Sequence, residues 1–405
     1  MSSTATPPST GDSAADVVKP GNALKRLAEG ELGSVRVIVM IALIWAIFQI
    51  AEDRFLTAPN LTNLGLQVVG TGLISIGVVL VLLLGEIDLS VGAVSGLAGS
   101  VMAVLSVKHG WGPVPALLGA ILVGAAIGLL QGSIATLLVI PPFIVTLAGQ
   151  LGWLGAQLRV LGDTGTVNIN DQTLVDLAGT FFSDGVGWTI AIVCCALLIG
   201  SAVLRQRRRV AAGLDAEPMV SIAIRTGAAS IAILGATAVF NRDRGMPLAV
   251  VILVAFVVLF QWLTGRTKFG RQIYAVGGNA EAARRAGINV TRVRITVFVL
   301  ASTMAAVGGI MLASRLLAVN QSSGGGDLLL LSIAGPVVAG VSLFGGRGNV
   351  WAALLGALVI GSISNGMDLL GLTSSVKYMI TGAVLLVAVV IDALSRRRRV
   401  SVGRA

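Results

Sequence analysis

Residues 69–85 read VGTGLISIGVVLVLLLG, an apolar run without a charged side chain. A helix needs about 20 mostly apolar residues to cross the hydrocarbon core of a bilayer, with some spread around that length. Eleven further stretches of similar character predict an all-α polytopic membrane protein with about 12 transmembrane helices, within a range of 10–12. The predicted spans are 35–51, 69–85, 89–107, 114–138, 142–161, 186–204, 219–240, 246–264, 294–314, 328–345, 350–370 and 376–394.

Three of these spans, the third, tenth and eleventh, are rich in glycine and flanked by glycine-containing turns. Irregular backbone is tolerated at membrane depth where protein or a cavity surrounds it. We therefore expect each of the three to be either a full helix or a broken or re-entrant one.

Composition agrees with a membrane protein: 55% of the 405 residues are hydrophobic and only 12% are charged. Soluble domains usually carry about 25% charged residues. The 52 glycines suit close helix packing in lipid, where water does not drive helices together. The net charge of +10 comes largely from arginines clustered between apolar runs, so membrane topology explains it and we expect no nucleic-acid partner.

The distribution of basic residues predicts the orientation of the chain, because cytoplasmic loops carry an excess of Lys and Arg. With both termini placed in the cytoplasm, the basic segments fall inside, whereas the loop 162–185 carries four aspartates and no Lys or Arg and falls outside. We expect residues 1–34 to be a disordered cytoplasmic tail, 35–395 the transmembrane domain and 396–405 a basic cytoplasmic tail. The basic inside segments are Arg205 with Arg207, Arg208 and Arg209, the loop 265–293, and Arg396 to Arg399.

The loop 265–293 contains a short helix signal. Asn279 is a favourable N-cap, the residues after it are strong helix formers, and Gly287 stands where a helix commonly ends. Glu281 in the first turn and arginines in the last turn both suit the helix dipole. Isolated helices of two turns are marginal in water, so this helix either packs on its own chain or on another protein, or is a well-capped surface turn.

Several motifs resemble those of ribose- and xylose-type ABC sugar transporter permeases, in the branched-chain amino acid and ribose permease superfamily. They occur in the family's order over about 35–395, and a basic insertion around 205–245 adds two spans, as in the longer xylose permeases. The matching segments are GEIDLSVG at 85–92, PFIVTLAG at 142–149, FGRQIYAVGGN at 269–279, EAA followed by Gly287 at 281–287, and NGM at 365–367.

The resemblance implies a permease subunit of an ABC importer in the bacterial cytoplasmic membrane, which moves a monosaccharide, with a pentose such as xylose as the best candidate. It implies alternating access driven by ATP hydrolysis in a separate ATPase subunit. It further implies a homodimer of permeases and an extracytoplasmic sugar-binding protein. The residues that would couple to the ATPase are Asn279, Glu281, Ala282, Ala283 and Gly287.

One departure from the family pattern concerns the acidic, alanine-rich segment that usually precedes a Gly-Gly turn. This chain has an apolar stretch from Leu328 to Leu331 there, and Asp327 is the nearest acid. The departure bears on the gate and on which sugar is carried.

Polar residues near the spans suggest where a path could lie. Asp88 is a candidate N-cap for the third helix through the N–H groups of Ser90 and Val91, and Glu86 and Asp88 together with Ser90 belong to a family motif near the path. Thr146 and Gln150 share a helical face, and they, like Asn365, could line a path or bond helices to one another.

Other functions have less support in the sequence. No phosphate-loop motif occurs, so we expect no ATP or other cofactor bound by this chain. The single histidine and the adjacent cysteines predict neither a catalytic group nor a metal site, so we do not expect an enzyme. The alternative is a secondary, ion-coupled transporter, but no predicted span carries an Asp, Glu, Lys or Arg near its middle with an obvious partner.

Overall fold

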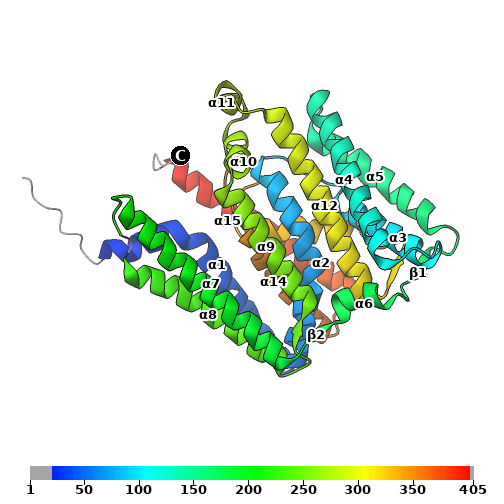
Figure 1. Cartoon of the computed structure of the whole chain (residues 1–405), viewed down its shortest axis with the longest axis horizontal. Helices are drawn as coiled ribbons and strands as arrows, with labels where there is room; N and C mark the ends of the chain where they lie inside the picture. Colours follow the sequence, from blue (N-terminus) through cyan, green and yellow to red (C-terminus); the bar gives the residue numbers. More distant parts are fainter. Residues whose placement is uncertain (1–20, 217, 402–405) are drawn as a thin grey trace, which may run out of the picture.

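The computed structural model describes residues 21–216 and 218–401 and is almost entirely helical (Figure 1). Its helices are α1 (Gly21–Ala51), α2 (Ala58–Leu83), α3 (Val91–Val107), α4 (Pro113–Leu137), α5 (Pro142–Leu161), α6 (Gln172–Gly179), α7 (Asp184–Ala211), α8 (Met219–Asn241), α9 (Leu248–Arg266), α10 (Lys268–Gly278), α11 (Ala280–Arg285), α12 (Val290–Leu316), α13 (Gly326–Val338), α14 (Trp351–Leu369) and α15 (Ser374–Ser401). Its strands are β1 (Thr166–Asn168), β2 (Phe181–Phe182), β3 (Met246–Pro247) and β4 (Ala318–Asn320).

The helical, membrane-spanning character predicted from the sequence is confirmed, and each predicted span overlaps a helix. Among the described residues, seven helices are long and apolar enough to cross a membrane: α2, α4, α7, α8, α9, α12 and α14. The full number of about twelve spans stays a prediction. The strands form only two antiparallel pairs, β1 with β4 and β2 with β3.

The tails are partly helical. Helix α1 begins at Gly21 and α15 runs to Ser401, so both helices extend into the ranges 1–34 and 396–405 predicted as tails. Alanine, leucine, lysine, arginine and glutamate after Gly21 favour a helix, which explains the early start of α1. Residues 1–20 and 402–405 lie outside the described residues.

Helix α12 forms the centre of the bundle and packs against α2, α3 and α4. Glycines allow this close approach: a Cβ atom on Gly77 of α2 would lie 2.6 Å from the carbonyl oxygen of Ala301, and one on Gly128 of α4 would lie 2.4 Å from that of Phe298. Small residues at helix contacts are the usual means of packing in lipid.

Of the helices that overlap predicted spans, α3 and α13 are the shortest. With 17 and 13 residues, they span about 26 Å and about 20 Å at 1.5 Å per residue, against a hydrocarbon core of about 30 Å. Their first turns meet, since a Cβ atom on Gly92 would lie 2.9 Å from the carbonyl oxygen of Gly324. The expectation of a short or broken helix therefore fits the third and tenth spans, whereas α14, the eleventh, has 19 residues and meets the length criterion.

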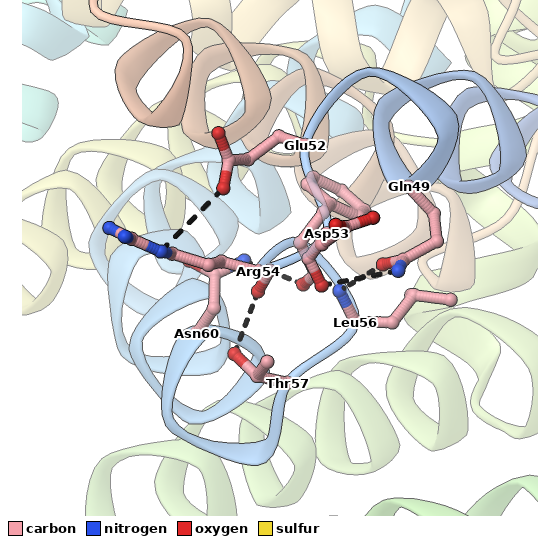
Figure 2. Close-up of polar contacts among 8 residues, drawn as sticks. Gln49, Glu52, Asp53, Arg54, Leu56, Thr57 and Asn60 are labelled. Atoms are coloured by element: carbon pink, nitrogen blue, oxygen red, sulfur yellow. Dashed lines mark hydrogen bonds and ion pairs between the residues drawn. The ribbon is translucent and has the colours of Figure 1, made fainter.

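A network of polar contacts closes the turn between α1 and α2 (Figure 2). Gln49 donates to the carbonyl of Asp53 at 3.1 Å and accepts from the backbone N–H of Leu56 at 2.8 Å, while Thr57 donates to the carbonyl of Arg54 at 2.7 Å. These bonds satisfy backbone groups where the chain leaves one helix for the next. The turn thereby fixes α1 beside α14, against which it packs.

Helices α7 and α8 form a peripheral hairpin, seen at the lower left of Figure 1. The most apolar window of α2 is 89% buried within the chain, whereas that of α7 is 22% buried and that of α8 is 0% buried. An apolar helix that its own chain leaves uncovered needs lipid or another apolar surface around it. The strand pair β2–β3, in which Phe182 is opposite Met246, joins the two ends of the hairpin.

Candidate functional site

Helix α11 has the boundaries that the sequence predicts. The side chain of Asn279 accepts from the N–H of Ala282 at 2.9 Å and so caps its N-terminus. At the other end Gly287 has φ +82°, a left-handed conformation that glycine adopts without steric cost. The local helix signal in the loop 265–293 is therefore confirmed.

The two faces of α11 differ in character. Ala283 is buried at 4% exposure, whereas the charged residues point outward. Glu281 pairs with Arg284 at 3.1 Å and with Arg285 at 3.3 Å, and all three side chains are more than half exposed. Exposed pairs of this kind contribute little to stability, so the outward charges leave a surface that another protein can contact.

Helix α10, which directly precedes α11, packs against the end of α2. A Cβ atom on Gly277 would lie 1.8 Å from the carbonyl oxygen of Leu83, so only glycine lets the two backbones approach this closely. The same carbonyl accepts from the N–H of Gly346 at 2.9 Å, and Tyr274 of α10 donates to the carbonyl of Gly348 at 2.8 Å. Three segments distant in the sequence therefore meet at one backbone junction.

The segment 84–90 continues from this junction into α3 and carries Glu86 and Asp88. Glu86 is buried and forms an ion pair with Arg294 of α12, with 2.7 Å between Oε1 and Nε. Burial raises the pKa of the Glu86 carboxyl, and the guanidinium of Arg294 opposes that rise. Sequence reasoning missed this partner because it lies 208 positions further along the chain.

Asp88 supports the start of α3 in a way that differs from the prediction. Its Oδ1 accepts from the N–H of Ser90 at 2.8 Å and from the Ser90 hydroxyl at 2.6 Å, and Ser90 itself is the N-cap residue. The expected bond from Val91 is not made, because the helix starts at Val91, two residues later than an Asp88 cap requires. The Ser90 hydroxyl also lies 2.9 Å from Oε1 of Gln131 on α4, which links the motif to a second helix.

The three candidate path residues lie in separate surroundings. Thr146 is fully buried and accepts from the N–H of Leu89 at 3.1 Å, and Gln150 is half-buried. Asn365 accepts from the side chain of Asn60 at 2.8 Å and so joins α14 to α2. The structure therefore gives Thr146 and Asn365 bonding roles between segments.

A cavity of about 240 Å³ lies between α3, the C-terminal part of α12 and the segment that leads into α13. Serine hydroxyls and glycine backbone dominate its polar wall, and Asp327 is its only ionisable residue among those described. Sequence reasoning missed it, although the run SSGGG at 322–326 is a signal for a tight, polar turn. The lining residues are Ser95, Gly96, Gly99, Gly309, Leu312, Ala313, Leu316, Ala318, Val319, Ser322, Ser323, Gly324, Gly325, Asp327 and Leu328.

Residues 60–389 match the family described as branched-chain amino acid transport system / permease component. The xylose transport system permease protein of Escherichia coli (strain K12) is 35% identical over 370 residues, which cover 90% of this chain and 93% of the relative. The ribose import permease protein of Bacillus subtilis (strain 168) is 32% identical over 349 residues, 85% of this chain and 88% of the relative. No solved structure matches this chain significantly.

Proposed function

Because this chain belongs to the family of branched-chain amino acid transport system permease components, we propose that it is the membrane-spanning permease subunit of an ATP-driven importer of a monosaccharide. The observation that carries the proposal is the exposed, capped helix α11, which follows α10, and Gly277 of α10 packs against Leu83 at the end of α2. A contact made on α11 can thereby reach the segment 84–90 and the start of α3.

The proposed substrate is a neutral monosaccharide, with a pentose such as xylose as the first choice. Relatives are named as permeases for xylose, ribose, fructose and D-allose, and the xylose permease of Escherichia coli (strain K12) is 35% identical over 90% of this chain. The cavity between α3 and α13 supports this choice, because hydroxyls and backbone groups bind sugar hydroxyls without requiring charge.

The proposed assembly contains two copies of this chain, ABC ATPase subunits and an extracytoplasmic sugar-binding protein. ATP would act on the ATPase subunits and not on this chain. The complex would lie in the bacterial cytoplasmic membrane, with both termini and α11 on the cytoplasmic side. Asn279, Glu281, Ala282, Ala283 and Gly287 are the proposed ATPase contact.

The proposed mechanism is alternating access. Closure of the ATPase subunits on ATP would move α11 and α10, and the shared junction at Leu83 would transmit that movement to α2 and to the segment 84–90. Since Ser90 of this segment caps α3, the wall of the cavity would move with it. Hydrolysis would reverse the movement and release the sugar to the cytoplasm.

Reversing the charge on α11 tests the proposed contact. In the full complex reconstituted in vesicles, we expect Glu281→Arg to reduce sugar-stimulated ATP hydrolysis at least about tenfold, since like-charge juxtaposition at an interface costs several kcal/mol. Asp163→Arg, an exposed change of equal charge in the 162–185 segment, is the control. If both variants retain normal stimulation, α11 does not form the contact.

A second substitution tests the cavity. A Cβ atom on Gly96 would lie 2.1 Å from the carbonyl oxygen of Ser323, whereas one on Gly99, a turn further along α3, would lie 3.2 Å from its nearest neighbour. We expect Gly96→Ala to displace the 321–325 turn and abolish xylose uptake, and Gly99→Ala to retain most of it. If Gly96→Ala takes up as much xylose in vesicles as Gly99→Ala and the unchanged chain do, this cavity is not on the path of the sugar.

The alternative, an ion-coupled transporter, is not favoured by the relatives, which are named as permeases of transport systems. Sugar uptake that occurs without any ATPase subunit, and that stops when an uncoupler is added, would support the ion-coupled alternative instead.

A further inference from the structure

A second cavity, of about 570 Å³, lies between α7, α8 and the end of α9. It is separate from the sites described above, and its wall is rich in positive charge. Five arginines line it: Arg205, Arg208 and Arg209 from α7, Arg225 from α8 and Arg266 from α9.

The general excess of arginine in cytoplasmic loops does not by itself explain this arrangement. Arg205, Arg208 and Arg209 are spaced three and four residues apart and so share one face of α7, whereas Arg207 lies off that face and does not line the cavity. Arginines from two other helices complete the wall. Side chains from three helices therefore concentrate positive charge on one hollow.

The same hollow has an apolar side. Ala202, Leu204, Leu214 and Ile222 also line it. Along α7 and α8 beyond it, large apolar side chains are exposed, with Leu197 at 67% and Ile231 at 73%. A cavity that is cationic at its rim and continuous with exposed apolar helix surface suits an amphipathic anion with hydrocarbon chains.

Backbone contacts position some of these arginines. Arg205 donates through Nε to the carbonyl of Ser201 at 3.3 Å, and Arg209 donates to the carbonyl of Asp215 at 3.3 and 3.4 Å. A guanidinium carries five N–H donors in a planar fork that matches phosphate oxygens. Arg205, for example, keeps both Nη groups for a ligand while its Nε is held.

We propose that this cavity binds the phosphate-bearing headgroup of an anionic phospholipid, with the acyl chains lying along α7 and α8. Basic pockets between membrane helices on the cytoplasmic side are a known means of binding such headgroups. The proposal depends on the membrane placement of α7 and α8 and not on the transported solute.

The site also touches the segment that leads to α11. Arg266 is the last residue of α9, and the next residue, Thr267, caps α10 by accepting from the N–H of Gly270 at 3.1 Å. A bound headgroup would therefore fix the end of α9 and the start of α10. Lipid composition would then influence how firmly α10 and α11 are held.

Lipid titration of the purified full chain tests the proposal. In uncharged detergent, we expect phosphatidylglycerol to raise the melting temperature more than phosphatidylcholine does, and with a lower apparent Kd. Arg208→Gln should weaken phosphatidylglycerol binding about fivefold, and Arg205→Gln with Arg208→Gln and Arg266→Gln about 100-fold, from the usual contribution of one basic residue to anionic lipid binding.

Arg207→Gln is the matched control, because it removes the same charge from the outer face of α7. Equal weakening by Arg207→Gln and Arg208→Gln would show general charge attraction and overturn the proposal. Inorganic phosphate that stabilises the chain as well as the lipid does, or that displaces it at millimolar concentration, would show a site for free phosphate instead. If the triple variant fails to fold, the comparison of the single variants Arg207→Gln and Arg208→Gln still decides between these outcomes.

Discussion

Gly277→Ala is expected to abolish sugar-stimulated ATP hydrolysis and xylose uptake while leaving the chain inserted in the membrane. The added Cβ atom would lie 1.8 Å from the carbonyl oxygen of Leu83 and 2.8 Å from the backbone nitrogen of Gly346. Backbone atoms cannot rotate away as a flexible side chain can, so α10 must move off the end of α2. Overpacking of this kind costs about 1–3 kcal/mol, and it breaks the junction through which α11 would act.

The adjacent glycine supplies the control for this experiment. A Cβ atom on Gly278 has no neighbour within 4 Å, and the substitution is made in the same turn of the same helix. Gly278→Ala should therefore keep normal hydrolysis and uptake in the reconstituted complex. If Gly277→Ala behaves like Gly278→Ala, the contact between α10 and α2 does not transmit movement.

Arg294→Gln is expected to lower the free energy of unfolding by about 3 kcal/mol at neutral pH, because breaking a buried ion pair leaves an unpaired charge. The Glu86 side chain is only 7% exposed, so water cannot replace the lost guanidinium. Unfolding in mixed micelles measures the change. Arg292→Gln, an exposed position two residues earlier on α12, should change stability by much less.

The pH dependence of this loss has a definite sign. Burial raises the pKa of Glu86 in the folded chain, and removing Arg294 takes away the opposing influence. The folded variant therefore binds a proton more readily than the unfolded chain, so its deficit should shrink as pH falls from neutral through that raised pKa. Glu86→Gln combined with Arg294→Gln should recover most of the stability at neutral pH. A deficit that is independent of pH, and that the double variant retains, would contradict the ion-pair explanation.

Local signals in the sequence predicted local structure well. Asn279 and Gly287 bound α11 because a cap and a left-handed glycine act within a few residues of each other. Helix positions followed from apolar run length alone. The glycines in and beside the third and tenth predicted spans indicated that α3 and α13 could be short, and they permit the close approach of Gly92 to Gly324.

Contacts between distant residues could not be predicted from one sequence. Glu86 meets Arg294, and Asn60 meets Asn365 across 305 positions, only after the bundle is packed. The same is true of the cavity beside α3, whose wall comes from two stretches far apart in the sequence, 95–99 and 309–328. The segment 162–185, predicted as a loop, contains strand β1, which pairs with β4, and helix α6, which Asp171 caps.

The ladder between β2 and β3 has a consequence for how chains of this kind vary in length. Phe182 and Met246 are paired neighbours, so the polypeptide leaves the bundle for α7 and returns from α8 at almost the same point in space. Two whole helices can thus be inserted or deleted between residues that already lie side by side, without separating the strands that they connect.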